Sequence, residues 1–175
     1  GAPGGGLAAT VHGSTRLTLD VQGNPRVVTD ARGNATQTQR FDLLGRPMKT
    51  VSADAGTTQT LLDVAGQPVD TWRSGDLEIR REYDALRRLQ QVWVTEGTAT
   101  ERLVDFRIYG ELLSSADALD GNLLGRVYRI YDTAGVLTNE TFDFKGNLSK
   151  VKRKVFSDIA LTMDWSGIET QTSIT

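Results

Sequence analysis

Carboxylates at regular spacing are the first feature of this 175-residue sequence that could do chemistry. Asp20, Asp42, Asp63 and Asp84 lie 22, 21 and 21 residues apart, each directly after an apolar residue or tyrosine. Such an array could suggest calcium ligands or catalytic acids, but calcium-binding β-roll repeats need a nine-residue, glycine-rich period. One Asp in every 10 or 11 residues favours turn closure instead, because an Asp that begins a turn can accept a hydrogen bond from a downstream amide.

Glycine three residues after the Asp supports this interpretation, because glycine takes a positive φ without steric cost and lets the chain reverse. The pattern of apolar residue, Asp, two variable residues and Gly recurs at Asp20, Asp42, Asp63, Asp132 and Asp143, whereas the copy at Asp84 has Arg87 in place of the glycine. We predict that the following are structural turn residues and that none is a catalytic, cofactor-binding or metal-binding residue: Asp20, Gly23, Asp42, Gly45, Asp63, Gly66, Asp132, Gly135, Asp143 and Gly146.

Two further aspartates fit the same register. Asp30 begins a half-period copy ten residues after Asp20. Asp105 lies another 21 residues beyond Asp84, although it falls inside a segment of β-strand composition, residues 102–109.

The remaining candidates for catalysis lack partners. Glu82 and Asp84 are two residues apart on one predicted strand face, a spacing that could place two carboxylates together as a catalytic pair. No base, nucleophile or metal ligand lies near them in the sequence, so a solvated strand is the better interpretation than a glycosidase dyad. His12 is the single histidine and is assigned no role. We therefore expect no enzymatic activity and no cofactor.

A basic run near the C-terminus and three tryptophans complete the set of candidates. The lysines alternate with other residues, which is typical of the solvated face of a strand, and an anion-binding patch or a protected sheet edge are the alternatives. A net charge of −2 and a pI near 5.4 argue against nucleic acid as a partner. The tryptophans are too irregularly spaced for a base-stacking platform and are expected to pack over a sheet. The basic run comprises Lys145, Lys150, Lys152, Arg153 and Lys154, and the tryptophans are Trp72, Trp93 and Trp165.

The segments that would position these turns have the composition of β-strands. Hydrophobic residues make up 38% of the chain and there are 18 glycines but only 4 prolines, which excludes a disordered or collagen-like chain. The absence of cysteine excludes disulfides and thiolate chemistry. We predict an all-β array of antiparallel hairpins over residues 15–175, as one region, with one short helix or loop insertion near 111–120. Residues 1–14 are expected to be a flexible lead or a remnant of cloning.

The residue before each Asp should point to one face of the sheet each time. A single curved sheet of this kind has one apolar face and two open edges, so we expect it to self-associate, to curl on itself or to be a fragment of a larger assembly. The residues at this position are Leu19, Phe41, Leu62, Tyr83, Val104, Tyr131 and Phe142.

The repeated motif resembles the Rhs/YD-repeat family over residues 15–156, with residues 41–47 (Phe-Asp-Leu-Leu-Gly-Arg-Pro) as its clearest copy. Residues 106–111, 122–132 and 134–148 further resemble the B component of bacterial insecticidal toxin complexes. The resemblance implies a curved β-sheet that forms part of a hollow shell, completed by a C component, around a toxin polypeptide. Its partners would be the rest of the shell and that enclosed polypeptide.

The family's autoproteolytic motif, β-propeller and toxin domain do not occur in this sequence, so the expected role is part of a shell wall. The implied location is extracellular, as part of a secreted bacterial toxin assembly, although this segment carries no signal peptide and no stretch able to insert into a membrane. The alternative is a cell-surface YD-repeat module that binds glycans or proteins. A carboxylate-based hydrolase is the third hypothesis and has the least support.

Overall fold

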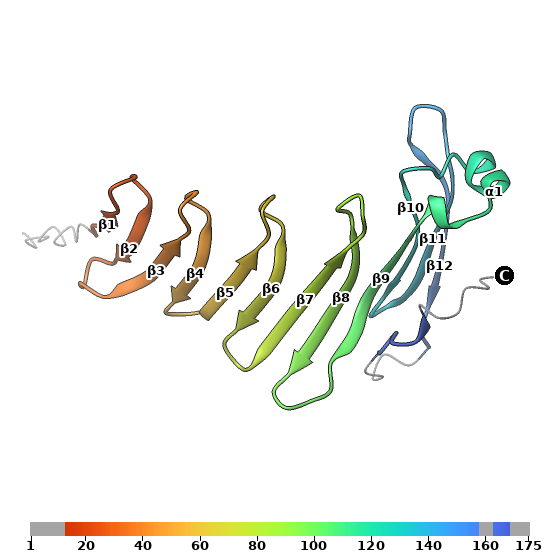
Figure 1. Ribbon diagram of the computed structural model, residues 1–175. Helices are drawn as coiled ribbons and strands as arrows, with labels where there is room; N and C mark the ends of the chain where they lie inside the picture. Colours follow the sequence, from red (N-terminus) through yellow and green to blue (C-terminus); the bar gives the residue numbers. More distant parts are fainter. Residues whose placement is uncertain (1–12, 158–162, 169–175) are drawn as a thin grey trace, which may run out of the picture. The chain divides into compact units, whose positions relative to one another are not determined.

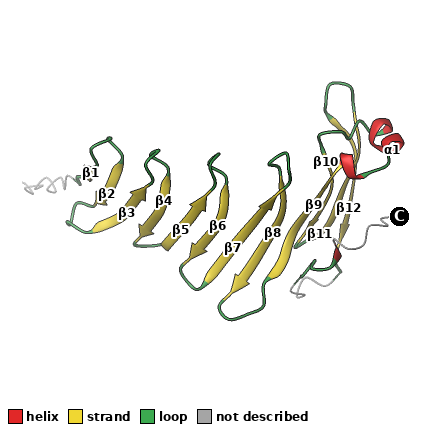
Figure 2. Ribbon diagram, in the orientation of Figure 1, coloured by secondary structure: helices red, strands yellow, loops and turns green. Residues whose placement is uncertain are grey.

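The computed structural model describes residues 13–157 and 163–168. In these residues, antiparallel strands are joined by short turns and accompanied by a single short α-helix (Figures 1 and 2). The predicted all-β array of antiparallel hairpins is therefore confirmed. The chain divides into two compact units, residues 1–60 and 61–175, which are described separately below. The expected flexible lead lies almost wholly outside the described residues, and the single repeat region over 15–175 stays a prediction.

Unit 1 is an antiparallel meander in which each strand pairs with the next one along the chain. Polar and β-branched side chains dominate its strands, and no described residue of the unit is fully buried. The described residues of unit 1 thus form a single layer without a buried core. Its strands are β1 (Arg16–Leu19), β2 (Pro25–Thr29), β3 (Ala35–Phe41), β4 (Pro47–Ser52) and β5 (Gly56–Leu62), whose last two residues fall in unit 2.

Unit 2 continues the meander with longer strands. Consecutive strands again pair antiparallel, and bulges interrupt the register at several points, for example between Val127 and Arg129. Its strands are β6 (Pro68–Arg73), β7 (Leu77–Tyr83), β8 (Leu89–Glu96), β9 (Arg102–Tyr109), β10 (Val127–Asp132), β11 (Gly135–Phe142) and β12 (Leu148–Val155).

The insertion between β9 and β10 contains the predicted helix. A 3-10 turn (Gly110–Leu112) precedes α1 (Ser115–Asp120), and the Ser114 hydroxyl caps α1 by accepting the amide of Asp117 at 3.2 Å. Ala118 and Leu123, both within the insertion, are buried. These contacts anchor a six-residue helix that would be too short to be stable alone.

The core of unit 2 is a cluster of Leu103, Phe106, Ile108 and Tyr131, of which Leu103 is completely buried. The C-terminal strap, residues 163–168, packs against this cluster. Trp165 lies edge-on to the Tyr131 ring at 5.0 Å between centroids. The sequence suggested a sheet without a second layer, and the strap corrects that expectation for unit 2, because it covers apolar side chains that the strands alone leave open.

The strap also completes the hydrogen bonding of β9. The amide of Leu103 donates to a carboxylate oxygen of Asp164 at 3.0 Å, and the carbonyl of Leu103 accepts the amide of Trp165 at 2.9 Å. The pairing of β10 with β9 covers only Phe106 to Tyr109, so the strap occupies the place beside Leu103 that a neighbouring strand would fill.

The residues before each Asp differ in exposure. Tyr131 is buried in the core, whereas Leu19 is 55% exposed. Leu19 lies on β1, which has a paired neighbour on one side only within the described residues, so fewer side chains surround it. Position in the repeat therefore determines the turn more strictly than it determines burial.

Candidate functional site

The repeated Asp-x-x-Gly turns share one hydrogen-bond pattern. At Asp42, one carboxylate oxygen accepts the amides of Leu44 and Arg46, both at 2.9 Å, while the Asp42 carbonyl accepts the amide of Gly45 at 3.1 Å. Gly45 has a φ of 74°, in the left-handed region that favours glycine. A carboxylate held in this way closes a turn and is unavailable as a base.

The same pattern recurs at the predicted turns of Asp20, Asp63 and Asp143, at the half-period copy and at Asp84. In each, the amides two and four residues after the Asp donate to one carboxylate oxygen. The glycines three residues after the Asp have φ between 74° and 88°. These turns comprise Asp20 with Gly23, Asp30 with Gly33, Asp63 with Gly66, and Asp143 with Gly146, and Asp84 closes its turn in the same way without a glycine.

These hydrogen bonds favour the ionised carboxylate. The amide of Arg46 is the main cause that holds the pKa of Asp42 below its ordinary value, and the amide of Gln67 does the same for Asp63. At Asp20 and Asp143 the largest cause is the side-chain amide of the asparagine four residues later. The turn carboxylates are thus stabilised as anions, which suits a structural role and not proton transfer.

The residue four positions after the Asp has a role that the sequence did not reveal. Its side chain donates to the second carboxylate oxygen: Arg46 does so to Asp42 at 2.6 Å, and Arg88 does so to Asp84 at 2.7 Å. Asn24 and Asn147 make the equivalent bond in their turns. The signal was the repeated Arg or Asn after the glycine position, which supplies a donor of matching length.

Asp132 and Asp105 differ from the other aspartates. Asp132 pairs directly with Gly135 in a hairpin with two intervening residues, and its carboxylate accepts only the amide of Ala134 among the local amides. Gly135 belongs to β11, where a Cβ atom would lie 2.1 Å from the carbonyl oxygen of Lys154. Close approach of β12 therefore explains that glycine. Asp105 lies in the middle of β9, where it binds Arg107 at 2.8 Å.

The suspected carboxylate pair is not assembled for catalysis. Glu82 forms an ion pair with Arg80 in β7, and Asp84 is held by its own turn and by Arg88. No group of three metal-ligating side chains occurs in residues 13–157 and 163–168. His12 lies outside the described residues. Both carboxylates are therefore held by arginines, an arrangement that suits ion pairing and not proton transfer.

The basic run, apart from Lys145 in the preceding turn, lies on β12, all of whose residues are exposed. Lys150 and Lys152 both form ion pairs with Glu140 of β11, and Lys150 is the main cause that lowers the pKa of Glu140. A hollow of about 390 Å³ lies beside these residues, lined by Tyr128, Arg129, Tyr131, Val136, Thr138, Glu140, Lys152 and Lys154. Ion pairs within the chain thus neutralise much of the positive charge that an anion-binding patch would need.

The tryptophans differ in their surroundings. Trp93 and Trp165 pack against the core of unit 2, and the guanidinium of Arg80 lies 5.1 Å from the Trp93 ring centre. Trp72 is 39% exposed and donates to Glu78 at 3.0 Å.

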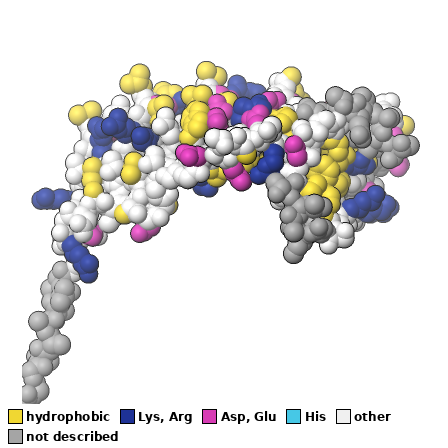
Figure 3. Space-filling model, turned by 90° about the horizontal axis from the view of Figure 1, so that it is seen from below, with side chains coloured by type: hydrophobic (Ala, Val, Ile, Leu, Met, Phe, Trp, Pro, Cys, Tyr) yellow, Lys and Arg dark blue, Asp and Glu magenta, His cyan; other side chains and the backbone are white. Residues whose placement is uncertain are grey.

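Acidic and basic side chains are mixed over the face shown in Figure 3. None of the described helices is long and apolar enough to span a membrane.

No protein-family model matches the sequence, and neither does any curated protein. The solved structures to which the chain is similar include a crystal structure of TcdB2-TccC3, with a TM-score of 0.80 and 28% identity over 87% of this chain and 8% of that chain. They also include a Tc holotoxin pore of Photorhabdus luminescens, with a TM-score of 0.81 and 28% identity over 90% of this chain and 8% of that one.

The chain therefore spans about a twelfth of the length of these structural relatives. The TM-scores show that the strand arrangement is similar to that of these structures, and the identities show that the sequence is similar as well. In fold, repeat and sequence, the chain resembles Rhs-like components of Tc toxin complexes.

Proposed function

We propose that this chain is a non-catalytic structural module that forms part of the wall of a toxin-complex shell and thereby encloses and protects a toxin polypeptide. The observation that carries the proposal is the match of an antiparallel hairpin array, over 87% of the chain, to toxin-complex chains. Two properties support it. The repeated aspartates close turns, and unit 1 has no fully buried residue among those described, as suits one layer of a larger structure.

The test is protease protection in the longer protein that contains this chain. The protein is digested with a broad-specificity protease in native buffer and again in denaturant, and the fragments are identified by mass spectrometry. We expect an internal polypeptide to survive in native buffer and to be cut after unfolding, because a closed sheet excludes the protease. Equal cleavage under the two conditions would overturn the proposal.

The enzymatic alternative has a separate test. Survey substrates for glycoside and ester hydrolysis are assayed with the chain and with Glu82→Gln and Asp84→Asn. We expect no turnover above buffer, because each carboxylate is already paired with an arginine. Turnover that both substitutions abolish would show that the chain is a hydrolase.

A further inference from the structure

The hollow beside β12 contains a half-buried arginine without an acidic partner. Arg129 of β10 forms no ion pair with any residue that the structure describes, whereas Arg107 of the neighbouring strand binds Asp105. Its Nη1 donates to the hydroxyl of Tyr131 at 3.2 Å and its Nη2 to the hydroxyl of Tyr128 at 3.0 Å. Its Nε is buried and has no hydrogen-bond partner in the described part of the chain. The chain thus withdraws this cation from water without supplying an anion, which is costly.

A β-bulge places Tyr128 and Arg129 on the same side of the sheet. Val127 pairs with Tyr109 and Arg129 pairs with Ile108, so Tyr128 is an extra residue without a partner in β9. In a regular strand consecutive side chains point to opposite faces, whereas here both side chains line the hollow. The Arg129 guanidinium lies 5.0 Å from the centre of the Tyr128 ring. The bulge therefore holds a cation and an aromatic ring together in one recess.

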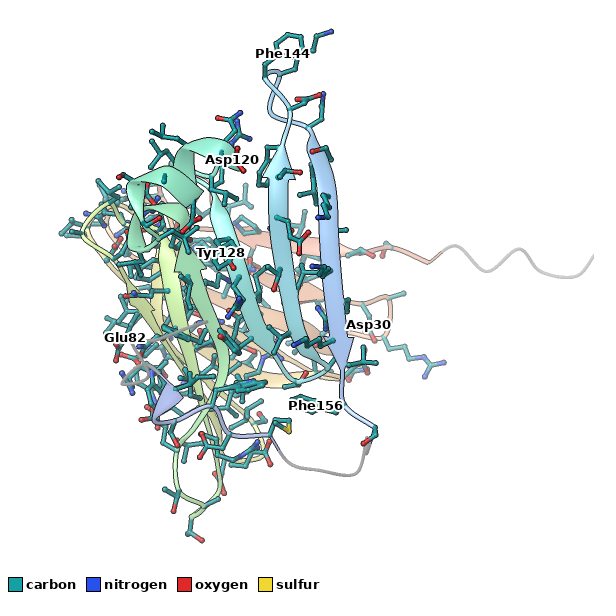
Figure 4. All side chains as sticks on the ribbon, turned by 90° about the vertical axis from the view of Figure 1, so that its right-hand side faces the viewer. Asp30, Glu82, Asp120, Tyr128, Phe144 and Phe156 are labelled. Carbon is teal, nitrogen blue, oxygen red and sulfur yellow. The ribbon has the colours of Figure 1, made fainter. Side chains whose placement is uncertain are left out.

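The hollow lies on the sheet face between the insertion and the strap. Tyr128 lines a second hollow together with Asp117 and Asp120 of α1, and it also packs against the core cluster that the strap contacts. Figure 4 shows Tyr128 on the sheet, with α1 above it and the strap below it. These elements border a recess of about 390 Å³. That volume is within the range of sites that take a small ligand or a few side chains.

The side chains that line the hollow carry a positive charge. Three cations, Arg129, Lys152 and Lys154, line it, and Glu140 is the only acidic residue among its described lining. Glu140 is shared by Lys150 and Lys152, whereas Lys154, like Arg129, has no ion-pair partner among the described residues. Two cations therefore remain uncompensated in a chain whose net charge is −2. The preference for an anion is thus local to this hollow.

We propose that the hollow beside β12 binds the carboxylate of an acidic peptide segment, with Arg129 as the main contact. Each Nη of Arg129 has a second hydrogen, and a guanidinium uses such a pair for two parallel bonds to one carboxylate. The hydroxyls of Tyr128 and Tyr131 accept from Arg129, so their own hydrogens are available to the same carboxylate. Val136 and the two rings give apolar contact to the stem of the bound acidic side chain.

A nucleic acid fits the hollow less well. Its phosphates are spread along a backbone, and proteins bind them with an extended basic surface. The neighbouring cations Lys150 and Lys152 are instead neutralised in part by Glu140. One guanidinium between two tyrosine hydroxyls suits a single carboxylate.

Fluorescence anisotropy of the full chain with a rhodamine-labelled peptide tests the proposal. The probe alternates glutamate with glycine, and the matched peptide has glutamine in place of every glutamate. Arg129→Gln removes the guanidinium, and Lys154→Gln removes the second uncompensated cation. The control Lys145→Gln removes the same charge from the β11–β12 turn, outside the hollow. Circular dichroism establishes that the variants fold like the wild type.

We expect the glutamate peptide to bind with an affinity that falls as the salt concentration rises, and the glutamine peptide not to bind. Arg129→Gln should raise the dissociation constant at least about tenfold, because charged hydrogen bonds are lost. Lys154→Gln, at an exposed side chain, should raise it about threefold, and Lys145→Gln should leave it unchanged.

A dissociation constant above about 1 mM for the wild type, or an equal loss in Lys145→Gln, would refute the proposal. If Arg129→Gln unfolds, an unchanged affinity in Lys154→Gln would refute it as well. Inorganic phosphate that binds in place of the glutamate peptide would assign the hollow to free anions instead. Peptide binding here requires no closed shell, so each of these failures would leave the proposed function standing.

Discussion

At the scale of the residue, one turn shows what the repeat requires of each position. Arg87 occupies the glycine position of its copy and has a φ of 63°, a left-handed conformation that a side chain makes unfavourable by about 1–2 kcal/mol. The turn forms nevertheless, because Asp84 supplies the same carboxylate bonds as its counterparts. The carboxylate bonds are thus sufficient to form the turn, and a glycine three residues after the Asp lowers the conformational cost of the turn.

We therefore expect Arg87→Gly to stabilise the chain by about 0.5 kcal/mol. Relief of the left-handed strain exceeds the loss of the exposed ion pair between Arg87 and Asp63, since such pairs contribute little. Urea unfolding at neutral pH measures the change. Leu86→Gly in the same turn is the control and should destabilise. A destabilised Arg87→Gly would mean that the ion pair outweighs the strain.

Acid should unfold the chain through the same turns. Because the native pKa values of carboxyls such as Asp42 and Asp143 lie below the unfolded value, the stability they contribute is fully present above about pH 4. It is lost as the pH falls through the lower native values. Asp42→Asn should flatten the dependence of unfolding free energy on pH below pH 4, whereas Leu43→Ala, which keeps the carboxylate, should not. An unchanged slope in Asp42→Asn would contradict this account.

At this scale the sequence predicted more of the turns than of their surroundings. Spacing located Asp42 and Gly45 because both act within one hairpin, where neighbours in sequence are neighbours in space. Asp105 kept the register but became part of β9, because Ile108 stands where a glycine would reverse the chain and both adjacent strands pair there. The sequence thus predicted the hydrogen bonding within each turn but not the pairing of strands across the sheet.

At the scale of the element, the strap is the feature that the sequence did not reveal. Residues 163–167 (Met-Asp-Trp-Ser-Gly) repeat the Asp-x-x-Gly pattern, which by itself predicts only another turn. In the structure, which leaves residues 158–162 undescribed, residues 163–168 return to β9. Asp164 and Trp165 contact Leu103, which lies about 60 residues earlier in the sequence, and the repeat does not predict this contact.

Trp165→Ala should therefore destabilise unit 2 by about 2 kcal/mol, less than the 3–5 kcal/mol typical of a fully buried aromatic, since Trp165 is only half-buried. The substitution removes the contacts with Tyr131 and the hydrogen bond to the Asp132 carbonyl. Urea unfolding followed by circular dichroism measures the loss. Trp72→Ala, at an exposed ring, is the control and should cost less. Equal destabilisation by the two substitutions would show that the strap does not stabilise unit 2 through Trp165.

At the scale of the whole molecule, the two units differ in what stabilises them. Unit 1 has strand pairing and turns but no fully buried described residue, whereas unit 2 has the Leu103 cluster beneath its strap. Composition predicted one β-sheet region and no such difference, because burial depends on which strands acquire a cover. The insertion near 111–120 was predicted, and its packing over Leu123 was not.

Amide hydrogen exchange should accordingly be faster in β2–β4 than in β8–β10, by about tenfold or more, because local opening costs less where no core is disrupted. Mass spectrometry of peptic peptides measures this at neutral pH. Peptides from β12, an exposed strand of unit 2, provide the comparison within the better-packed unit. Uniform exchange across the strands would show that the two units open together.

The strap also fixes an order of events in time. Each hairpin joins strands that are close in sequence and can form as soon as its second strand has left the ribosome, since short loops close quickly. The contact between Leu103 and Asp164 must wait until more than 60 further residues have been synthesised. Trp165 fluorescence would therefore change last during folding and would report the moment at which the core of unit 2 closes.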